Sequence, residues 1–260
     1  MEQWKLRARI VWADDGGPIR RIINGRHDRP TGFLVLRKGG FRAMPWDSRS
    51  CEKPALQLAN LSSRVVSLMA QPHRLEMELP GERVMKYIPD LMLKVHPSFL
   101  RDLKRGQVFS QVASSPATEM VPTERASILI LELKNDKDPR DKDDAYKRKL
   151  KFAKLVYKQV GITFLTLRRS PHLSKKLHLL TARMMLADQS TALSPADYAN
   201  CVSAFAGREW ISYQKATNAL GSGPMGKAKL HALHCRQFVS IDLGKGLKSF
   251  VRVWLMEGTR

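Results

Sequence analysis

Uninterrupted apolar positions mark one strand of this chain as covered on both faces. Residues 128–131 read Ile-Leu-Ile-Leu, whereas a strand with one face in water alternates apolar and polar residues. The charge-rich segment 135–159 follows with the spacing of an amphipathic helix, Gly161 ends it, and residues 162–167 form another apolar stretch. Strand, helix and strand in this order predict an α/β core with a mixed central sheet flanked by helices.

Shorter elements are predicted before these two strands. Ser48 or Ser50 can cap a helix whose apolar residues fall on one face. Residues 64–69 and 75–79 have the length and composition of short strands. Together with the next strand they predict an antiparallel β unit.

A third strand is predicted over residues 84–95, where apolar and polar residues alternate after a Pro-Gly turn. Pro89 has no amide hydrogen to donate to a neighbouring strand. The strand is therefore expected to bend there and to leave the carboxylate of Asp90 projecting.

The remaining segments are assigned by composition. Residues 1–49 are basic and contain several Gly and Pro, and they predict an irregular arm or a small β unit. Residues 96–124 have no clear period, so only a helical turn or two is predicted there. Residues 171–260 are mostly helical and end in a basic, Gly-containing hairpin, which predicts a winged-helix-like domain. The expected division is a basic extension at 1–49, a core at 50–170 and a C-terminal domain at 171–260.

Charge narrows the class of partner. The chain carries 45 Lys and Arg against 24 Asp and Glu, a net charge of +21, and this excess predicts an acidic polymer as the partner. A hydrophobic content of 43% excludes a disordered basic tail. We therefore expect a folded protein that binds double-stranded DNA. The cations proposed for contact with DNA are Arg20, Arg21, Arg26 and Arg29.

Cysteine usage and hydropathy bear on the compartment. Three cysteines without a Cys-x-x-Cys pair predict neither a disulfide framework nor a cysteine-rich zinc module, which fits a reducing compartment. His231, His234 and Cys235 lie beside leucines on one predicted helix, which favours a core over a zinc site. The chain lacks a run of about eighteen apolar residues, so we expect a cytoplasmic protein with no membrane partner.

The candidate chemistry lies where the apolar strand ends. Glu132 and Lys134 are two positions apart, so both project from one face of the strand, and Asp90 on an adjacent strand can meet them. Charges at the end of a central strand are costly unless they are paired or bind a metal. Two carboxylates and an ammonium therefore predict a Mg²⁺ site, with Mn²⁺ as a substitute. The alternative, a cross-strand pair on the surface, is disfavoured by the apolar run before Glu132.

Such a site suits phosphodiester hydrolysis. The reaction needs a nucleophilic water and neutralisation of a developing negative charge, and Mg²⁺ held by carboxylates serves both needs. Lys134 would orient or deprotonate the attacking water. Glu52 on the predicted helix is a third candidate acid, although a glutamate in a first turn is by itself a solvated charge that favours the helix dipole.

The order of these motifs resembles a known family. An early Glu on a helix, a strand hairpin, Tyr-x-Pro-Asp, an apolar strand ending in Glu-x-Lys, a helix and a strand are similar to the TnsA endonuclease subunit of heteromeric bacterial transposases. That subunit belongs to the restriction-endonuclease-like PD-(D/E)xK nucleases. The resemblance is most specific in Ser-Cys-Glu at 50–52, Gln-Pro-His-Arg-Leu at 71–75, the eight residues 83–90 and Ile-Leu-Ile-Leu-Glu-Leu-Lys at 128–134.

The resemblance implies a Mg²⁺-dependent DNA endonuclease that nicks the 5′ strands at transposon ends during cut-and-paste transposition. It also implies two partners, a DDE-type transposase that cuts and joins the 3′ strands and an AAA+ ATPase regulator, and a place in the bacterial cytoplasm at the nucleoid. On this resemblance Glu52, Asp90 and Glu132 are metal ligands or their neighbours, and Lys134 positions water. The chain departs from the family in the long segment 96–124 and in the arm 1–49.

Two other functions stay open on the sequence. One is a non-catalytic DNA-binding assembly factor of a recombination complex, in which the acidic residues have lost the metal. The other is a stand-alone restriction or repair nuclease of the same fold. Metal-dependent nicking of a supercoiled plasmid separates enzyme from binder, and co-purification with a transposase separates a partner subunit from a stand-alone enzyme.

Overall fold

The computed structural model describes residues 6–20, 30–119 and 122–256, and the chain divides into two compact units. The first unit contains the described residues up to Leu56 together with Ser67–Lys94 and Ser127–Ser170. The second unit contains Gln57–Val66, Val95–Ala126 and the described residues from Pro171 onward. Both units combine helices with strands, which confirms the predicted α/β class.

These units are not the consecutive segments that the sequence pattern predicts. The boundary after Ser170 is shared by both divisions, but residues 95–126 belong to the second unit rather than to the segment 50–170. Helix α2 (Pro97–Lys104) and helix α3 (Phe109–Ser114) bury Phe99 and Phe109, whose rings meet edge to face with centroids 5.8 Å apart. Helix α3 also contacts α6 (Lys176–Ala187), and this long-range packing leaves no period in the local sequence.

The central sheet contains the strand predicted to be covered on both faces. Its order is β4 (Val65–Ala70), β7 (Leu91–Val95), β8 (Ser127–Lys134) and β9 (Thr163–Arg168). Strands β8 and β9 are parallel and are joined through α4 (Asp144–Gln159). Parallel neighbours need such a crossover connection, because a tight turn cannot join them. Every residue of β8 from Leu129 to Lys134 is buried, so both faces of the strand are covered.

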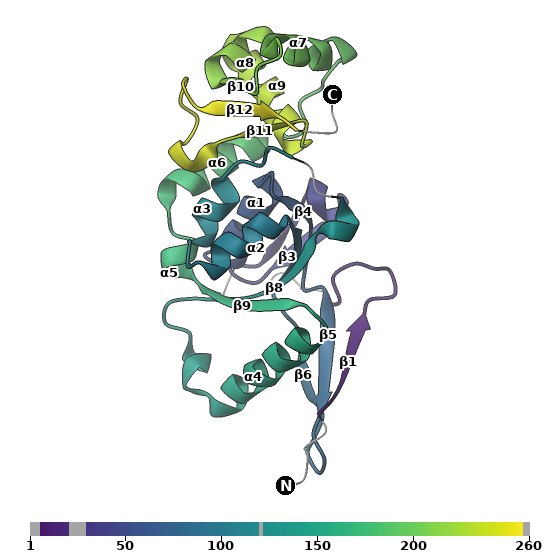
Figure 1. The fold of residues 1–260 in the computed structure, drawn as a ribbon. Helices are drawn as coiled ribbons and strands as arrows, with labels where there is room; N and C mark the ends of the chain where they lie inside the picture. Colours follow the sequence, from purple (N-terminus) through teal and green to yellow (C-terminus); the bar gives the residue numbers. More distant parts are fainter. Residues whose placement is uncertain (1–5, 21–29, 120–121, 257–260) are drawn as a thin grey trace. The chain divides into compact units, whose positions relative to one another are not determined.

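A second sheet in the first unit includes part of the predicted basic extension. Strand β1 (Arg7–Trp12) pairs antiparallel with β5 (His73–Glu78), which pairs antiparallel with β6 (Met85–Tyr87) (Figure 1). A hairpin of β2 (Gly32–Val35) and β3 (Ala43–Trp46) follows. The described part of segment 1–49 therefore contains three strands, all paired within the first unit. Arg7 and Arg9 alternate in β1 with Ala8 and Ile10, and Ile10 packs against the core. The arginines made this segment read as a basic arm rather than as a strand.

The chain around Pro89 forms two strands rather than one bent strand. Strand β6 ends at Tyr87 in the second sheet, and β7 begins at Leu91 in the central sheet. Because Pro89 cannot extend a hydrogen-bonded ladder, the chain leaves one sheet and enters the other across residues 88–90. The predicted break at Pro89 is confirmed, and there the chain changes sheets instead of only bending within one strand.

Helix α1 (Glu52–Leu61) begins where the sequence predicts. The Cys51 amide donates to Ser48 Oγ at 3.1 Å, so Ser48 rather than Ser50 holds the turn that leads into the helix. Ala55, Leu58 and the rest of its apolar face are buried. This start brings Glu52 to the first turn.

The second unit joins helices to a three-stranded antiparallel sheet. Beyond α2, α3 and α6, its helices are α7 (Pro195–Phe205), α8 (Tyr213–Ala219) and α9 (Gly223–Cys235), with the short α5 (Arg169–His172) at the junction. The sheet has the order β10 (Trp210–Ser212), β12 (Arg252–Leu255), β11 (Val239–Ile241). In the described part of the chain no helix has both the length and the apolar character required to cross a membrane.

Two short segments of this unit depart from a simple helical pattern. Residues 210–212 form a strand before α8, and the Gly-rich residues 223–226 form the first turn of α9. Pro224 suits a first helical turn, because its missing amide hydrogen is not needed there. A Cβ at Gly226 would lie 2.4 Å from the carbonyl oxygen of Thr217, so this glycine permits α9 to pack closely on α8.

Candidate active site

Asp90 is placed by the passage of the chain from one sheet to the other. The Gln71 amide donates to the Asp90 carbonyl oxygen at 2.9 Å, which fixes the backbone just before β7. The side chain turns toward β8, where the Leu133 amide donates to Asp90 Oδ2 at 2.6 Å. The carboxylate of Asp90 thus lies beside the backbone between Glu132 and Lys134, the two residues that the sequence pairs with it.

Glu132 is held by two tyrosines. Its side chain is 1% exposed, and Tyr87 Oη donates to Glu132 Oε2 at 2.7 Å. Tyr146 Oη, from the first turn of α4, donates to Glu132 Oε1. Burial, followed by the nearby carboxylate of Glu132, raises the pKa of both tyrosines, so both hydroxyls stay protonated and act as donors. These two bonds fix the orientation of the carboxylate.

Three carboxylates repel one another at this place. The pKa of Glu52 is raised to about 7, mainly by burial and also by the charges of Asp47 and Glu132, while the Asp47 amide, which donates to Glu52 Oε2 at 2.7 Å, opposes the shift. Burial raises the pKa of Asp90 well above its usual value, and the charges of Glu132 and Glu52 add to this. Glu52 is therefore a buried member of an acidic cluster and not the solvated first-turn charge of the alternative interpretation. We call Glu52, Asp90 and Glu132 the acidic corner.

A cavity of about 850 Å³ opens beside the acidic corner. Glu52 and Asp90 line it, together with the backbone region after Leu133. Five cationic side chains also line it, Arg20, Arg49, Lys137, Arg140 and Arg169, as do the carboxylates of Asp47, Asp136 and Asp138. A cavity lined by both cations and carboxylates suits a phosphate backbone and a metal ion, because cations bind phosphates and carboxylates bind divalent ions.

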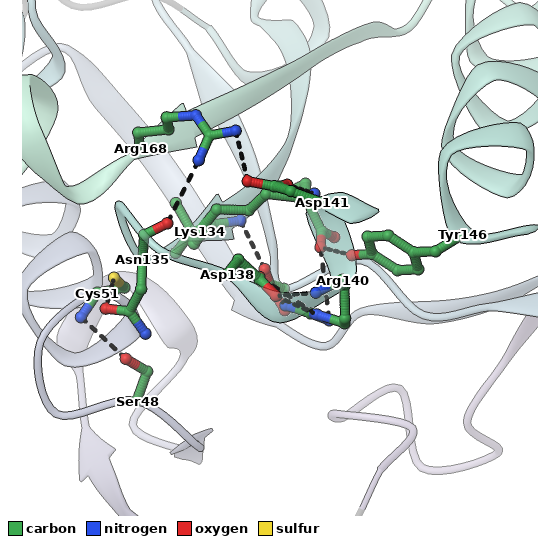
Figure 2. Close-up of polar contacts among 12 residues, drawn as sticks. Ser48, Cys51, Lys134, Asn135, Asp138, Arg140, Asp141, Tyr146 and Arg168 are labelled. Carbon is green, nitrogen blue, oxygen red and sulfur yellow. Dashed lines mark hydrogen bonds and ion pairs between the residues drawn. The ribbon is translucent and has the colours of Figure 1, made fainter. Parts of the chain in front are cut away.

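Lys134 is buried and points to a residue that the sequence did not single out. Its Nζ donates to Asp141 Oδ1 at 2.8 Å and lies 4.7 Å from the centre of the Tyr146 ring. Asp141 belongs to the short 3-10 helix η3 (Pro139–Lys142) and also accepts from Arg168 at 2.7 Å (Figure 2). The Lys134 ammonium is thus bound to Asp141. Asp90 is bound instead by the backbone amide of Leu133.

Arg140 of η3 is a cation beside the acidic corner. Its guanidinium donates to Asp138 at 2.7 Å, and another of its nitrogens is 3.9 Å from Glu132 Oε1. The guanidinium also lies over the Tyr146 ring, 4.8 Å from its centre, and Figure 2 shows Arg140, Asp138 and Tyr146 gathered beside Lys134. Segment 138–146 therefore contacts Glu132 and Lys134 with side chains of its own.

The acidic corner fits a divalent cation through two ligands. In residues 6–20, 30–119 and 122–256 no three His, Cys, Asp or Glu side chains are arranged to hold a metal ion. Mg²⁺ needs fewer, because it is usually bound through one or two carboxylates and keeps several waters. Asp90 and Glu132 supply hard oxygen donors, and burial, with the charges of neighbouring carboxylates added to it, raises the pKa of both Asp90 and Glu52.

Sequence reasoning located the acids and the lysine but missed their partners. Tyr87 stands in the Tyr-x-Pro-Asp motif, and its Glu132 contact has no local signature. Arg140, Asp141 and Tyr146 lie in a charge-rich segment that was assigned to one long helix. The Asp-Pro pair at 138 and 139 was the available signal, because an aspartate before proline caps a new turn.

Only one of the four arginines proposed for DNA contact can be placed. Arg20 lines the cavity and forms an ion pair with Asp47 at 2.7 Å. Arg21, Arg26 and Arg29 lie outside the described residues.

No protein-family model matches the chain, and it has no significant match among curated proteins. The geometry of the acidic corner is therefore the basis for assigning a function.

Proposed function

We propose that this protein is a Mg²⁺-dependent DNA endonuclease with a restriction-endonuclease-like core. The observation that carries the proposal is the position of Asp90, whose carboxylate binds the backbone amide between Glu132 and Lys134. Asp90, just before β7, thus lies beside the end of β8, which carries Glu132 and Lys134, and next to a cavity that cations help to line. A structural ion pair would not require a third carboxylate, Glu52, to be buried with them.

The side chains divide the work of hydrolysis. When bound, Mg²⁺ supplies activation of water and neutralises the charge that develops on the phosphoryl oxygens. Asp90 and Glu132 would hold the ion, and their own bonds to Leu133 and Tyr87 keep the carboxylates from turning away. Lys134 would orient the attacking water by donating from Nζ, while Asp141 keeps the ammonium in place. Cations around the cavity bind the phosphates that flank the scissile bond.

We infer that the second unit contains a winged-helix-like domain that docks DNA or a partner protein. The order α7, β10, α8, α9, β11, β12 with one antiparallel three-stranded sheet supports this inference. Exposed aromatic and basic residues share this sheet, since the Arg252 guanidinium lies 4.4 Å from the centre of the Trp210 ring. Such a surface suits contact with a nucleic acid.

The proposed biological reaction is nicking of the 5′ strands at transposon ends, in the bacterial cytoplasm at the nucleoid. Its support is the motif order Tyr-x-Pro-Asp and Glu-x-Lys, which resembles the TnsA subunit. On that basis the partners are a DDE-type transposase and an AAA+ ATPase regulator. A stand-alone restriction or repair nuclease would use the same corner, and copurification of the transposase is the test between them.

One observation favours a second function. Both carboxylate oxygens of Glu132 already accept from tyrosines, and Arg140 adds a positive charge nearby. A corner satisfied in this way would also suit a non-catalytic DNA-binding assembly factor. Cleavage assays separate the two functions.

The test is nicking of supercoiled plasmid carrying transposon ends, by the full-length protein with Mg²⁺ or Mn²⁺ and with a partner transposase present. Asp90→Asn, Glu132→Gln and Lys134→Gln should each lower the nicking rate by at least about 100-fold, because each removes a charge that acts at the phosphate. DNA affinity should change little, since it is spread over many cations. The matched control is Glu82→Gln, which alters an exposed carboxylate paired with Arg148. Parental rates in all three variants would refute a nuclease site at this corner.

A further inference from the structure

Arg140 is the cation of η3 that approaches the acidic corner. One of its nitrogens is 3.9 Å from Glu132 Oε1, and its charge also acts on Asp90, where it opposes the rise in pKa of that carboxyl. The same side chain lines the cavity through which a metal ion or a phosphate would arrive. Arg140 therefore partly neutralises the two carboxylates that are proposed to hold a divalent ion.

The attachments of the acids and of the arginine differ. Asp90 is bound to the amide of Leu133, and Glu132 is bound by Tyr87 and Tyr146, so both carboxylates are fixed by buried groups. The Arg140 side chain is 51% exposed and is held by Asp138, its neighbour on the same turn. The arginine can thus move without disturbing β8, whereas the carboxylates cannot.

A divalent ion between Asp90 and Glu132 would stand close to this guanidinium. Like charges at such separations repel strongly in a partly buried site, because solvent screens them poorly. The ion and the guanidinium in its observed position therefore compete for the same negative charge. The open cavity, which Arg140 already lines, gives the displaced guanidinium room to move.

We propose that Arg140 is the resident counter-ion of the acidic corner and that its guanidinium must swing away before a divalent cation binds between Asp90 and Glu132. This inference rests on the proposed metal site and adds a restraint to it. Arg140 lowers the metal affinity of the protein when no DNA is present. It thereby limits hydrolysis by the isolated chain.

The experiment measures Mn²⁺ binding to the full-length protein without DNA, by the electron paramagnetic resonance signal of free Mn²⁺. Arg140→Gln should tighten binding by about tenfold, because it removes the competing charge and keeps a side chain of similar length. Arg140→Lys keeps the charge and should stay within about twofold of the parent. Arg148→Gln is the matched control, since Arg148 has a similar exposure, lies on α4 and pairs with Glu82.

The outcomes separate this inference from the proposed function. If Glu132→Gln abolishes Mn²⁺ binding while Arg140→Gln binds as the parent does, the metal site stands and the restraint is refuted. Equal tightening by Arg148→Gln and Arg140→Gln would also refute it, because a general loss of charge would then explain the effect. If neither the parent nor Arg140→Gln binds Mn²⁺, the metal site itself fails. Because Arg140 lies on a half-exposed turn we expect the variant to fold, and Arg140→Met gives the same expectation if Gln does not.

Discussion

Each unit of this protein buries a polar cluster, and the two clusters differ in how their charges are balanced. In the second unit Asp188, His231 and Tyr213 form a closed chain, in which His231 Nδ1 donates to Asp188 Oδ2 at 2.6 Å and Tyr213 Oη donates to His231 Nε2 at 2.8 Å. The carboxylate can only accept, so it fixes which nitrogen of the imidazole carries the proton. In the first unit the acidic corner holds three carboxylates beside a cavity.

The comparison shows why burial of a polar group is by itself a poor guide to function. Burial lowers the pKa of His231, and the bond to Asp188 opposes that shift, so a neutral imidazole has one donor and one acceptor and both are used. In the acidic corner burial raises the pKa of Glu52 and Asp90, and neighbouring carboxylates raise it further. A cluster whose members satisfy one another stabilises the fold, whereas one whose members repel one another costs stability and serves a ligand.

The largest expected effect separates the clusters by stability and activity. His231→Ala should lower the free energy of unfolding by about 3 kcal/mol, because it leaves Tyr213 and Asp188 without a buried partner. Nicking below the melting temperature should keep the parental rate, since His231 lies in the second unit. Calorimetry and the plasmid assay measure the two quantities. A variant that melts like the parent but fails to nick would contradict the structural role.

The next prediction concerns the sign of the pH dependence. The folded pKa of Glu52, about 7, is above the unfolded value, so the carboxyl costs no stability below about pH 4.5 and costs most above pH 7. Glu52→Gln should therefore stabilise the protein by roughly 2 to 3 kcal/mol at pH 8 and by little at pH 4.5. Urea unfolding at the two pH values measures this difference. An equal change in stability at both pH values would show that its surroundings do not raise the pKa of Glu52.

His231 should show the opposite sign. Its pKa in the folded protein is lowered by burial, so the stability that it contributes is complete above its unfolded value and is lost as the pH falls below it. His73 in the first unit behaves in the same way, because burial lowers its pKa to about 4. Lowering the pH thus reduces the stability contributed by His231 and His73, and it removes the cost in stability of the ionised Glu52.

The sequence predicted one cluster and could not predict the other. Strand period two placed Glu132 and Lys134 on a common face, and Pro89 predicted where Asp90 would project, so local rules located the acids. Asp188 and His231 are 43 residues apart on separate helices, and no local pattern joins them. The leucines beside His231 correctly indicate a core residue, which is 3% exposed, but its partner depends on how α6, α8 and α9 pack.

The fold shows the same division between local and long-range information. The apolar run of β8, the cap at Ser48 and the stop at Gly161 act on their own neighbours, and the predicted elements are present there. The pairing of β1 with β5 and the packing of α3 on α6 join distant segments. Tertiary contacts decide these features, so composition alone left the segment 1–49 open between an irregular arm and a small β unit.

A smaller effect tests how Glu132 is oriented. Tyr146→Phe removes one of its two donors and leaves the ring that Lys134 and Arg140 contact. We expect the nicking rate to fall by about tenfold with little change in DNA affinity, because a positioning bond is lost while charge is kept. Glu132 retains Tyr87 as a donor, so stability should fall by only about 1 kcal/mol. A greater loss of affinity than of rate would place Tyr146 in DNA binding instead.

The smallest effect belongs to the surface of the cavity. Arg20 pairs with Asp47 while half exposed, so Arg20→Ala should change the free energy of unfolding by less than about 0.5 kcal/mol. If its guanidinium contacts a phosphate, the slope of log affinity against log salt should shrink by about one. Titration of labelled DNA over a range of salt concentrations measures the slope, and Arg9→Ala, which removes an exposed cation paired with Glu76, is the matched control. A slope equal to that of the control would remove Arg20 from the DNA surface, because both variants lose the same charge and only the place of the loss differs.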